Sequence, residues 1–220
     1  MNMTEKMKEV KEEILEILKS TKRPGMDKLC EKLDEIGFFT APCSGAYHLE
    51  KEGGLAEHSL NVYKIMDADA AMKFGTDEYV SIINSIKVCA LLHDVGKCGD
   101  YGKPNYVPNM IKDGRPTKAD PVQKYKQSET KPYETNKDLS PIDHEIRSVK
   151  IVSKYIDLTE DEELAILWHN GLYGNFKYQI QNHETALYLL LHSADMWASR
   201  VTEVENQPER IMGLPFWTVR

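Results

Sequence analysis

The adjacent residues His93 and Asp94 are the first feature of the sequence that is suited to chemistry. They follow an apolar run from Val88 to Leu92, and such a run predicts a buried helix end. A buried carboxylate needs a charged partner, and a metal ion can serve as one. Because borderline divalent metals prefer imidazole and carboxylate ligands, the pair is a candidate for part of a metal site, although by itself it indicates only a buried polar helix end.

Further candidate ligands are residues that lie on or near the end of a predicted helix. They are His58, His144, His169 and Asp195. A helical bundle builds a core site from side chains on several helices, so ligands far apart in the sequence are expected. A single histidine of this kind is more often a structural residue than a ligand. The metal interpretation therefore depends on the combination.

Apolar residues at three- and four-residue spacing predict the helices that must hold these ligands. The predicted helices cover residues 3–18, 26–36, 53 onward, 79–92, 140 onward, 159–168 and 183–201. Thr159 and Glu162 have the spacing of a capping box. The pattern predicts an all-α bundle with an N-terminal helical cap at 1–37 and a C-terminal tail at 206–220.

Residues 100–140 differ in composition, since they hold five prolines and little helical periodicity. We expect a long insert in the helical domain. Residues 109–115 are typical of a small hairpin, because Asp113-Gly114 suits the positive φ angles of a tight two-residue turn. The insert carries eight basic and six acidic side chains, a net charge of +2, and four tyrosines. It is expected to form a lid over the site, and a polar surface loop is the alternative.

Four of the candidate ligands lie in two motifs and at one further acidic residue. The motifs and that residue are Gly53-Gly54-Leu55-Ala56-Glu57-His58-Ser59-Leu60-Asn61-Val62, Leu91-Leu92-His93-Asp94-Val95-Gly96-Lys97 and Asp195. In combination they resemble the HD superfamily of metal-dependent phosphohydrolases, which is named for a His, His-Asp, Asp ligand pattern. The resemblance implies an HD-domain bundle with His58, His93, Asp94 and Asp195 as primary ligands. It implies His144 and His169 as ligands of a second metal.

The segment Phe39-Thr40-Ala41-Pro42-Cys43-Ser44-Gly45-Ala46-Tyr47-His48 extends this likeness. Together with the Gly-Gly-Leu-x-x-His motif that follows, it resembles the HD domains of bacterial 3′→5′ exoribonucleases and of conjugative relaxase proteins. The likeness covers roughly residues 38–205. The sequence departs from the family at Asn170, which follows His169 where a second histidine is usual.

The chemistry implied by the resemblance is hydrolysis of phosphate esters, in a nucleotide or a short nucleic acid, by a metal-activated water. Asp94 is expected to bridge metals or orient the water, and Lys97 to hold a phosphate oxygen; these are the implied catalytic residues. The expected substrate contacts are Lys97, His48, Arg200 and Arg115. An exposed lysine at a helix C-terminus is the alternative for Lys97. A surface salt bridge is the alternative for Arg200.

The implied cofactor is one or two divalent ions, drawn from Mn²⁺, Fe²⁺, Co²⁺, Ni²⁺ and Mg²⁺. The implied partner is a phosphorylated small molecule or a short single-stranded nucleic acid. Two other classes of function stay open. One is a non-catalytic HD protein that binds a nucleotide or protein partner and uses the metal for structure, and the other is a nucleic-acid-binding scaffold.

Composition sets limits on class and location. The chain has 220 residues, 41% hydrophobic and 29% charged, values near those of soluble globular proteins. A net charge of −7 argues against a broad basic face for duplex DNA. The sequence has neither a bilayer-length apolar run nor a signal-like N-terminus, so we expect a cytoplasmic protein without membrane contact. The four cysteines lack CxxC spacing, which favours reduced thiols.

Overall fold

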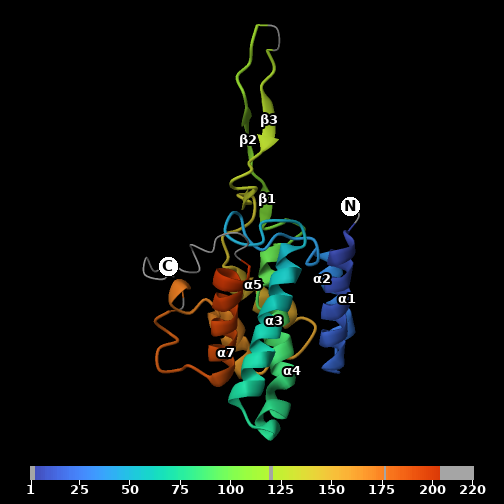
Figure 1. Ribbon diagram of the computed structural model, residues 1–220, viewed down its shortest axis with the longest axis vertical. Helices are drawn as coiled ribbons and strands as arrows, with labels where there is room; N and C mark the ends of the chain where they lie inside the picture. The colour runs from blue at the N-terminus through green and yellow to red at the C-terminus, as the bar shows by residue number, and fades with distance from the viewer. Residues whose placement is uncertain (1–2, 119–120, 176, 204–220) are drawn as a thin grey trace, which may run out of the picture.

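The computed structural model describes residues 3–118, 121–175 and 177–203. Within these ranges a helical body carries a narrow β-hairpin arm along the longest axis of the molecule (Figure 1). In chain order the elements are α1 (Glu5–Ser20), α2 (Met26–Glu35), α3 (Gly54–Lys73), α4 (Thr76–Leu92), η1 (Val95–Cys98), β1 (Tyr106–Pro108), β2 (Met110–Asp113), β3 (Lys124–Gln127), β4 (Tyr133–Thr135), α5 (His144–Val152), α6 (Glu160–Trp168), η2 (Gly171–Tyr173), α7 (Ala186–Trp197) and η3 (Ala198–Thr202).

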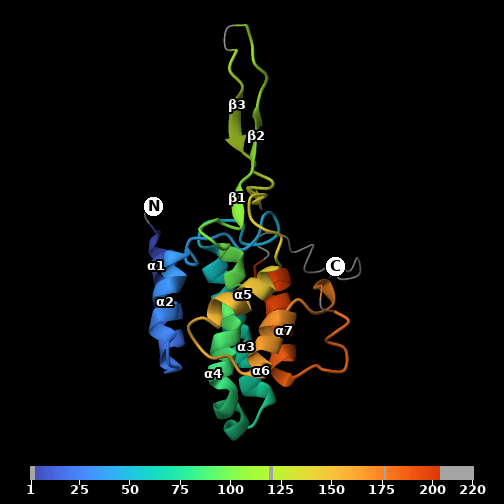
Figure 2. The same cartoon turned by 180° about the vertical axis from the view of Figure 1, so that it is seen from behind.

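Helices α3 and α4 form the centre of the body, with α1 and α2 on one side and α7 on the other (Figures 1 and 2). Two clusters of buried apolar side chains join these helices. The first contains Leu18 of α1, Leu33 of α2, Leu60 of α3 and Leu92 of α4. The second joins α3, α4, α6 and α7. The helices of the predicted N-terminal cap thus bury their apolar faces in the same cluster as the main domain.

Local sequence features explain how the ligand-bearing helices begin and end. Thr159 and Glu162 form the predicted capping box of α6, with the Thr159 hydroxyl accepting from the Glu162 N–H and the Glu162 carboxylate accepting from the Thr159 N–H. Thr185 caps α7 through its hydroxyl in a similar way. The last turns of α4, from Val88 to Leu92, are fully buried, as their apolar composition predicts.

The expectation of an all-α fold is wrong, because four short strands lie in the insert. Strand β1 pairs with β4 and β2 pairs with β3, both antiparallel. The residues of β3 are polar and all exposed, so they lack the alternation that marks a half-buried strand in a sequence. Backbone hydrogen bonds rather than apolar burial hold this ribbon together. The hydrophobic pattern of the sequence therefore does not predict its strands.

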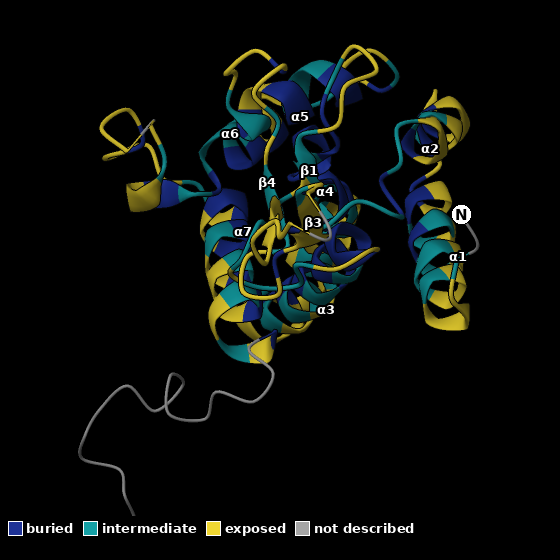
Figure 3. Ribbon diagram, turned by 90° about the horizontal axis from the view of Figure 1, so that it is seen from above, coloured by how far each residue is buried: buried dark blue, intermediate teal, exposed yellow. Residues whose placement is uncertain are grey.

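The predicted two-residue turn at Asp113-Gly114 is also wrong. Gly114 does adopt a positive φ of 70°, but the cross-strand partner of Asp113 is Lys124, so a longer connection joins β2 to β3. The ribbon points away from the body (Figures 1 and 2), and the residues of both strands are exposed (Figure 3). This part of the insert therefore does not cover the body, as the expected lid would.

The predicted tail, residues 206–220, lies outside the described residues. In the described part of the chain, no helix combines the length and the apolar character needed to cross a bilayer.

Candidate metal centre

All six predicted ligands lie together inside the helical body. They are His58 on α3, His93 and Asp94 directly after α4, His144 at the start of α5, His169 directly after α6, and Asp195 on α7. The ring centroids of neighbouring histidines in this group lie 4.8 to 5.4 Å apart. His58, His93, Asp94 and His169 are each at most 1% exposed. Imidazole and carboxylate groups that are removed from water in this way need hydrogen bonds, opposite charges or a metal ion to offset the cost of burial.

Asp94 divides the centre into two halves, and its Oδ2 faces the first half. This oxygen lies 3.6 Å from Nε2 of His58 and 3.4 Å from Nε2 of His93. Asp195 also faces His58, since its Oδ1 lies 3.2 Å from Nε2 of that ring. The first half therefore offers two imidazole nitrogens and two carboxylates.

The second half lies around Oδ1 of Asp94. This oxygen is 3.1 Å from Nε2 of His144 and 3.5 Å from Nε2 of His169. The side-chain nitrogen of Asn170 lies 3.4 Å from the first of these imidazole nitrogens and 3.2 Å from the second, and it donates to Glu145 at 2.6 Å. An amide N–H₂ group therefore stands where a further ligand would complete this half.

The polar atoms of the centre fit a divalent ion. Nε2 of His58, Nε2 of His93 and Oδ1 of Asp94 are buried and have no hydrogen-bond partner, while Oδ2 of Asp94 is paired with Nζ of Lys97. Each such atom costs about 1–3 kcal/mol if it stays unpaired. Two ligand atoms about 2.1 Å from one ion lie about 3.0 to 3.4 Å apart at octahedral or tetrahedral angles. The observed nitrogen–oxygen distances of 3.1 to 3.6 Å are close to this range, so this cluster could hold a metal ion.

Hydrogen bonds behind two of the imidazoles aim them at the centre. Nδ1 of His93 lies 2.9 Å from the carbonyl of Ala90, and Nδ1 of His169 lies 2.8 Å from the carbonyl of Ile166. Because a carbonyl only accepts, each Nδ1 carries a proton and each Nε2 keeps the lone pair that binds a metal. Both rings fold back on the helix that they terminate.

Glu203 gives His58 the same support, although it is not among the ligands predicted from the sequence. Its two carboxylate oxygens each lie 3.0 Å from Nδ1 of His58, and one accepts from Nδ2 of Asn61 at 3.0 Å. The π-helix η3 brings Glu203 to this position, since its backbone N–H donates to the carbonyl of Ala198. Such wide turns are frequent at functional sites, but hydrophobic spacing does not reveal them.

Lys97 lies beside Asp94, not on the open surface. Its Nζ is 2.6 Å from Oδ2 of Asp94, and its side chain is 15% exposed, so the alternative of a solvent-exposed lysine is wrong. The thiol sulfur of Cys43 lies 4.0 Å from the same Nζ. Cys43 also forms a potential ligand group with His48 and His58, and all four cysteines are free, as predicted.

Burial and charge act in opposite directions on these groups. Burial alone would raise the pKa of Asp94, but Lys97 and His93 lower it well below its ordinary value. Burial alone would lower the pKa of His58, but Cys43 and the nearby carboxylates raise it well above its ordinary value. Asp94 is therefore ionised at neutral pH, as a metal ligand must be, and binding of a metal at His58 would release a proton.

Gly96 allows η1 to approach α5 closely enough for Asp94 to face His144. A Cβ atom at Gly96 would lie 2.0 Å from the carbonyl oxygen of His144, and the Gly96 N–H donates to Oγ of Ser148 at 2.8 Å. Any side chain at this position would force η1 and α5 apart and move Asp94 away from His144.

The other three predicted substrate contacts, His48, Arg200 and Arg115, do not lie beside Asp94 as Lys97 does. His48 contacts Glu203 behind His58, with 2.7 Å between Nδ1 and the carboxylate. Arg200 on η3 is exposed and has no hydrogen bond or ion pair with any described residue. Arg115 follows β2 on the arm and is exposed as well. The structure therefore does not bring Arg200 or Arg115 to the metal centre.

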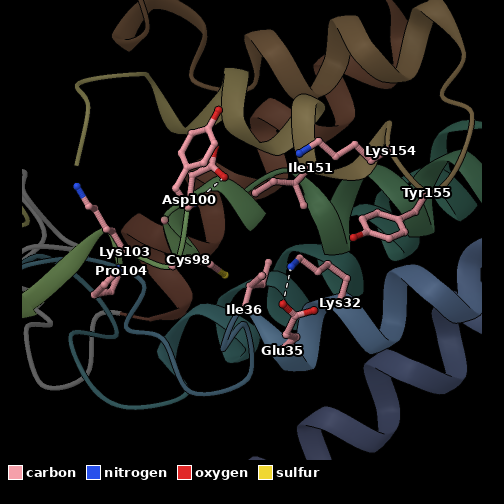
Figure 4. A pocket seen from close by; sticks show the side chains of 13 residues that line it. Lys32, Glu35, Ile36, Cys98, Asp100, Lys103, Pro104, Ile151, Lys154 and Tyr155 are labelled. Atoms are coloured by element: carbon pink, nitrogen blue, oxygen red, sulfur yellow. Dashed lines mark hydrogen bonds and ion pairs between the residues drawn. The ribbon is translucent and has the colours of Figure 1, made fainter. Parts of the chain in front are cut away.

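A groove of about 710 Å³ opens beside the second half. His144 and Arg147 line its inner side, and Tyr106 and Lys131 line the side that belongs to the arm. A separate pocket of about 440 Å³ is lined by side chains of α2, η1 and α5 and of the segments that follow η1 and α5 (Figure 4). None of the six predicted ligands lines that pocket, whereas His144 lines the groove.

Comparisons with protein-family models, with curated proteins and with solved structures found no match to this chain.

Proposed function

We propose that this protein is a metal-dependent phosphohydrolase of the HD type that cleaves phosphate esters in a nucleotide or a short nucleic acid. The observation that carries the proposal is the position of Asp94. Its two oxygens face two different groups of imidazoles; Oδ1 is buried without a hydrogen-bond partner, and Oδ2 is paired with the Lys97 ammonium. The sequence motifs around His58 and around His93-Asp94 support the same class.

A divalent ion in this centre supplies Lewis acidity toward a phosphoryl oxygen and lowers the pKa of a bound water. The chain's own residues hold and orient the reacting groups. His58, His93, Asp94 and Asp195 would hold the first ion, and His144 and His169 would share a second ion with Asp94. The groove beside His144 leaves the second half open to a substrate.

Lys97 is the residue proposed to bind a phosphate oxygen. Its ammonium already lies at ion-pair distance from Asp94 and is shielded from bulk water. Burial alone would lower its pKa, but Asp94 raises it well above the ordinary value, so the group stays positively charged. A fixed positive charge next to the metal ligands suits a point contact with a phosphate.

The donor set favours Mn²⁺, Fe²⁺, Co²⁺ or Ni²⁺, since mixed imidazole and carboxylate ligands suit such ions, with Mg²⁺ a weaker fit. The first half, with four protein ligands, is the stronger site. In the second half Asn170 points an N–H₂ group at both imidazoles, so a second ion is expected to bind more weakly.

The test is metal content together with hydrolysis. Protein purified without chelators is analysed for bound metals, and cleavage of bis(p-nitrophenyl) phosphate and of a nucleotide panel is followed with each of the five ions. We expect bound metal and hydrolysis that Asp94→Asn reduces to the level of the metal-free protein. Asp77→Asn, an exposed change on α4, serves as the matched control.

Two other results would overturn the proposal. A protein that binds no metal and hydrolyses none of the substrates would remove its basis. A protein that binds metal but hydrolyses nothing would favour the alternative of a non-catalytic HD protein that binds a nucleotide or a protein partner and uses its metal for structure.

A further inference from the structure

The β-hairpin arm carries none of the six predicted ligands, yet its base lines the groove beside His144. Asn109 joins the two ladders: its backbone N–H donates to Pro132 and its carbonyl accepts from Ser128, each at 2.9 Å. Below this joint, β1 and β4 contact the body, where the Tyr133 N–H donates to Gly45. Above it, β2 and β3 extend away from the body (Figure 1).

The extended part of the arm is basic in a chain that is acidic overall. Residues 110–127 carry five basic and two acidic side chains, a net charge of +3, whereas the whole chain has −7. Lys112 and Arg115 are exposed and have no carboxylate partner among the described residues. This concentration of positive charge attracts a polyanion.

One face of the ribbon combines this charge with an aromatic ring. Lys112 pairs directly with Tyr125, and Met110 pairs with Gln127, so these four side chains share a face. The Tyr125 side chain is 57% exposed and Met110 is 52% exposed. An exposed ring next to a lysine is suited to stacking on a base while the ammonium meets a phosphate.

The groove continues from the base of the arm to the metal centre. Lys131 and Tyr106 line it at the arm, and His144 lines it at the centre. Arg147, which also lines it, is 2% exposed and its Nε is buried without a hydrogen-bond partner. The lining of the groove thus carries three basic side chains, Lys131, Lys137 and Arg147, and two acidic ones, Glu134 and Asp143. The Arg147 guanidinium donates to Asn105 and to the Ser140 carbonyl.

We propose that the arm and the groove bind one strand of nucleic acid and direct it toward His144. Binding depends only on the arm and the groove, whereas cleavage of the bound strand rests on the proposed function. A single strand fits better than a duplex, because its unstacked bases can reach Tyr125 and because the acidic body offers no broad basic face.

The experiment measures fluorescence anisotropy of labelled 20-mers of oligothymidylate and oligouridylate, with phosphorothioate linkages that resist hydrolysis, in Mn²⁺ and after EDTA treatment. The arm variants are Lys112→Ala/Lys131→Ala and Tyr125→Ala. The matched control is Lys19→Ala/Lys28→Ala, which removes the same charge from exposed sites on α1 and α2. A 20-base-pair duplex and vesicles containing phosphatidylserine are the competing ligands.

We expect the double arm variant to bind about tenfold more weakly and to lower the slope of log affinity against log salt by about 1.4, or about 0.7 for each lost phosphate contact. Tyr125→Ala should weaken binding about tenfold with little change in that slope. The control should bind like the unaltered protein, and the vesicles should not compete.

Equal binding by the arm variants and the unaltered protein would overturn the inference, and so would preference for the duplex or for the vesicles. Failure of the proposed function gives a different result. In that case the oligonucleotides bind through the arm, but the Mn²⁺-loaded protein cleaves neither unmodified oligonucleotides nor bis(p-nitrophenyl) phosphate.

Discussion

Glu203 contacts Nδ1 of His58 with both of its carboxylate oxygens at 3.0 Å, while Nε2 of the same ring faces Asp94 and Asp195. A carboxylate behind an imidazole fixes the orientation of the ring and raises its basicity toward a metal. His58 is therefore held between an orienting group and the predicted first metal position.

Glu203→Gln should weaken binding of the first ion about 10- to 100-fold, because the amide keeps a similar shape but removes the negative charge behind His58. Titration with Mn²⁺ or Co²⁺ against a chelating dye measures this affinity. Glu12→Gln, an exposed change on α1, is the control. An unchanged affinity in Glu203→Gln would show that the contact does not support a ligand.

Addition of metal should stabilise the folded protein, because the unfolded chain lacks the assembled centre. At an ion concentration 100 times the dissociation constant the gain is about 2.7 kcal/mol, which corresponds to a rise in Tm of about 5 to 10 °C for a chain of this size. Thermal unfolding with and without Mn²⁺ measures the shift. Asp94→Asn should abolish it, and a full shift in that variant would contradict the bridging position.

Asn170→His should strengthen the second metal site, since an imidazole would replace the N–H₂ group that faces His144 and His169. The expected result is a stoichiometry closer to two ions per chain in equilibrium dialysis at a fixed Co²⁺ concentration. Asn84→His on α4, away from the centre, controls for an added histidine. If Asn170→His leaves the stoichiometry unchanged, Asn170 does not limit the second site.

Glu162 makes the free energy of unfolding depend on pH in the acidic range. Burial alone would raise its pKa, but hydrogen bonds from Arg23, Ser85 and the Thr159 backbone lower it in the folded protein. A carboxyl whose pKa is lower in the folded state stabilises the protein above its unfolded pKa near 4.5 and loses that effect as pH falls through the folded value.

Glu162→Gln should therefore cost about 2 kcal/mol at pH 7, and progressively less as the pH falls below 4.5 toward the lowered folded-state pKa, because the stabilisation depends on the ionised carboxylate. Urea unfolding at a series of pH values measures the difference from the unaltered protein. Glu163→Gln removes an exposed charge from the same helix and should have little effect. A cost that does not vary with pH would contradict the assignment.

The helices and the ligands of the candidate centre were largely predictable from sequence. Three- and four-residue apolar spacing marks the helices because the buried face of a helix repeats at that period. His93-Asp94 at the end of the apolar run in α4 pointed to a polar group in the core, and the structure places the six predicted ligands together there. The strands of the arm were missed, because exposed polar strands carry no such period.

By itself, then, the sequence determined the helical pattern, the residue types and the spacing that suit a metal. Only the tertiary structure decided that Glu203 supports His58 and that Asn170 occupies the second half of the centre. It also decided that the arm points away from the body. The physical reason is that these contacts join residues distant in the chain, through a π-helical turn, a buried amide and a backbone ladder, none of which repeats along the sequence.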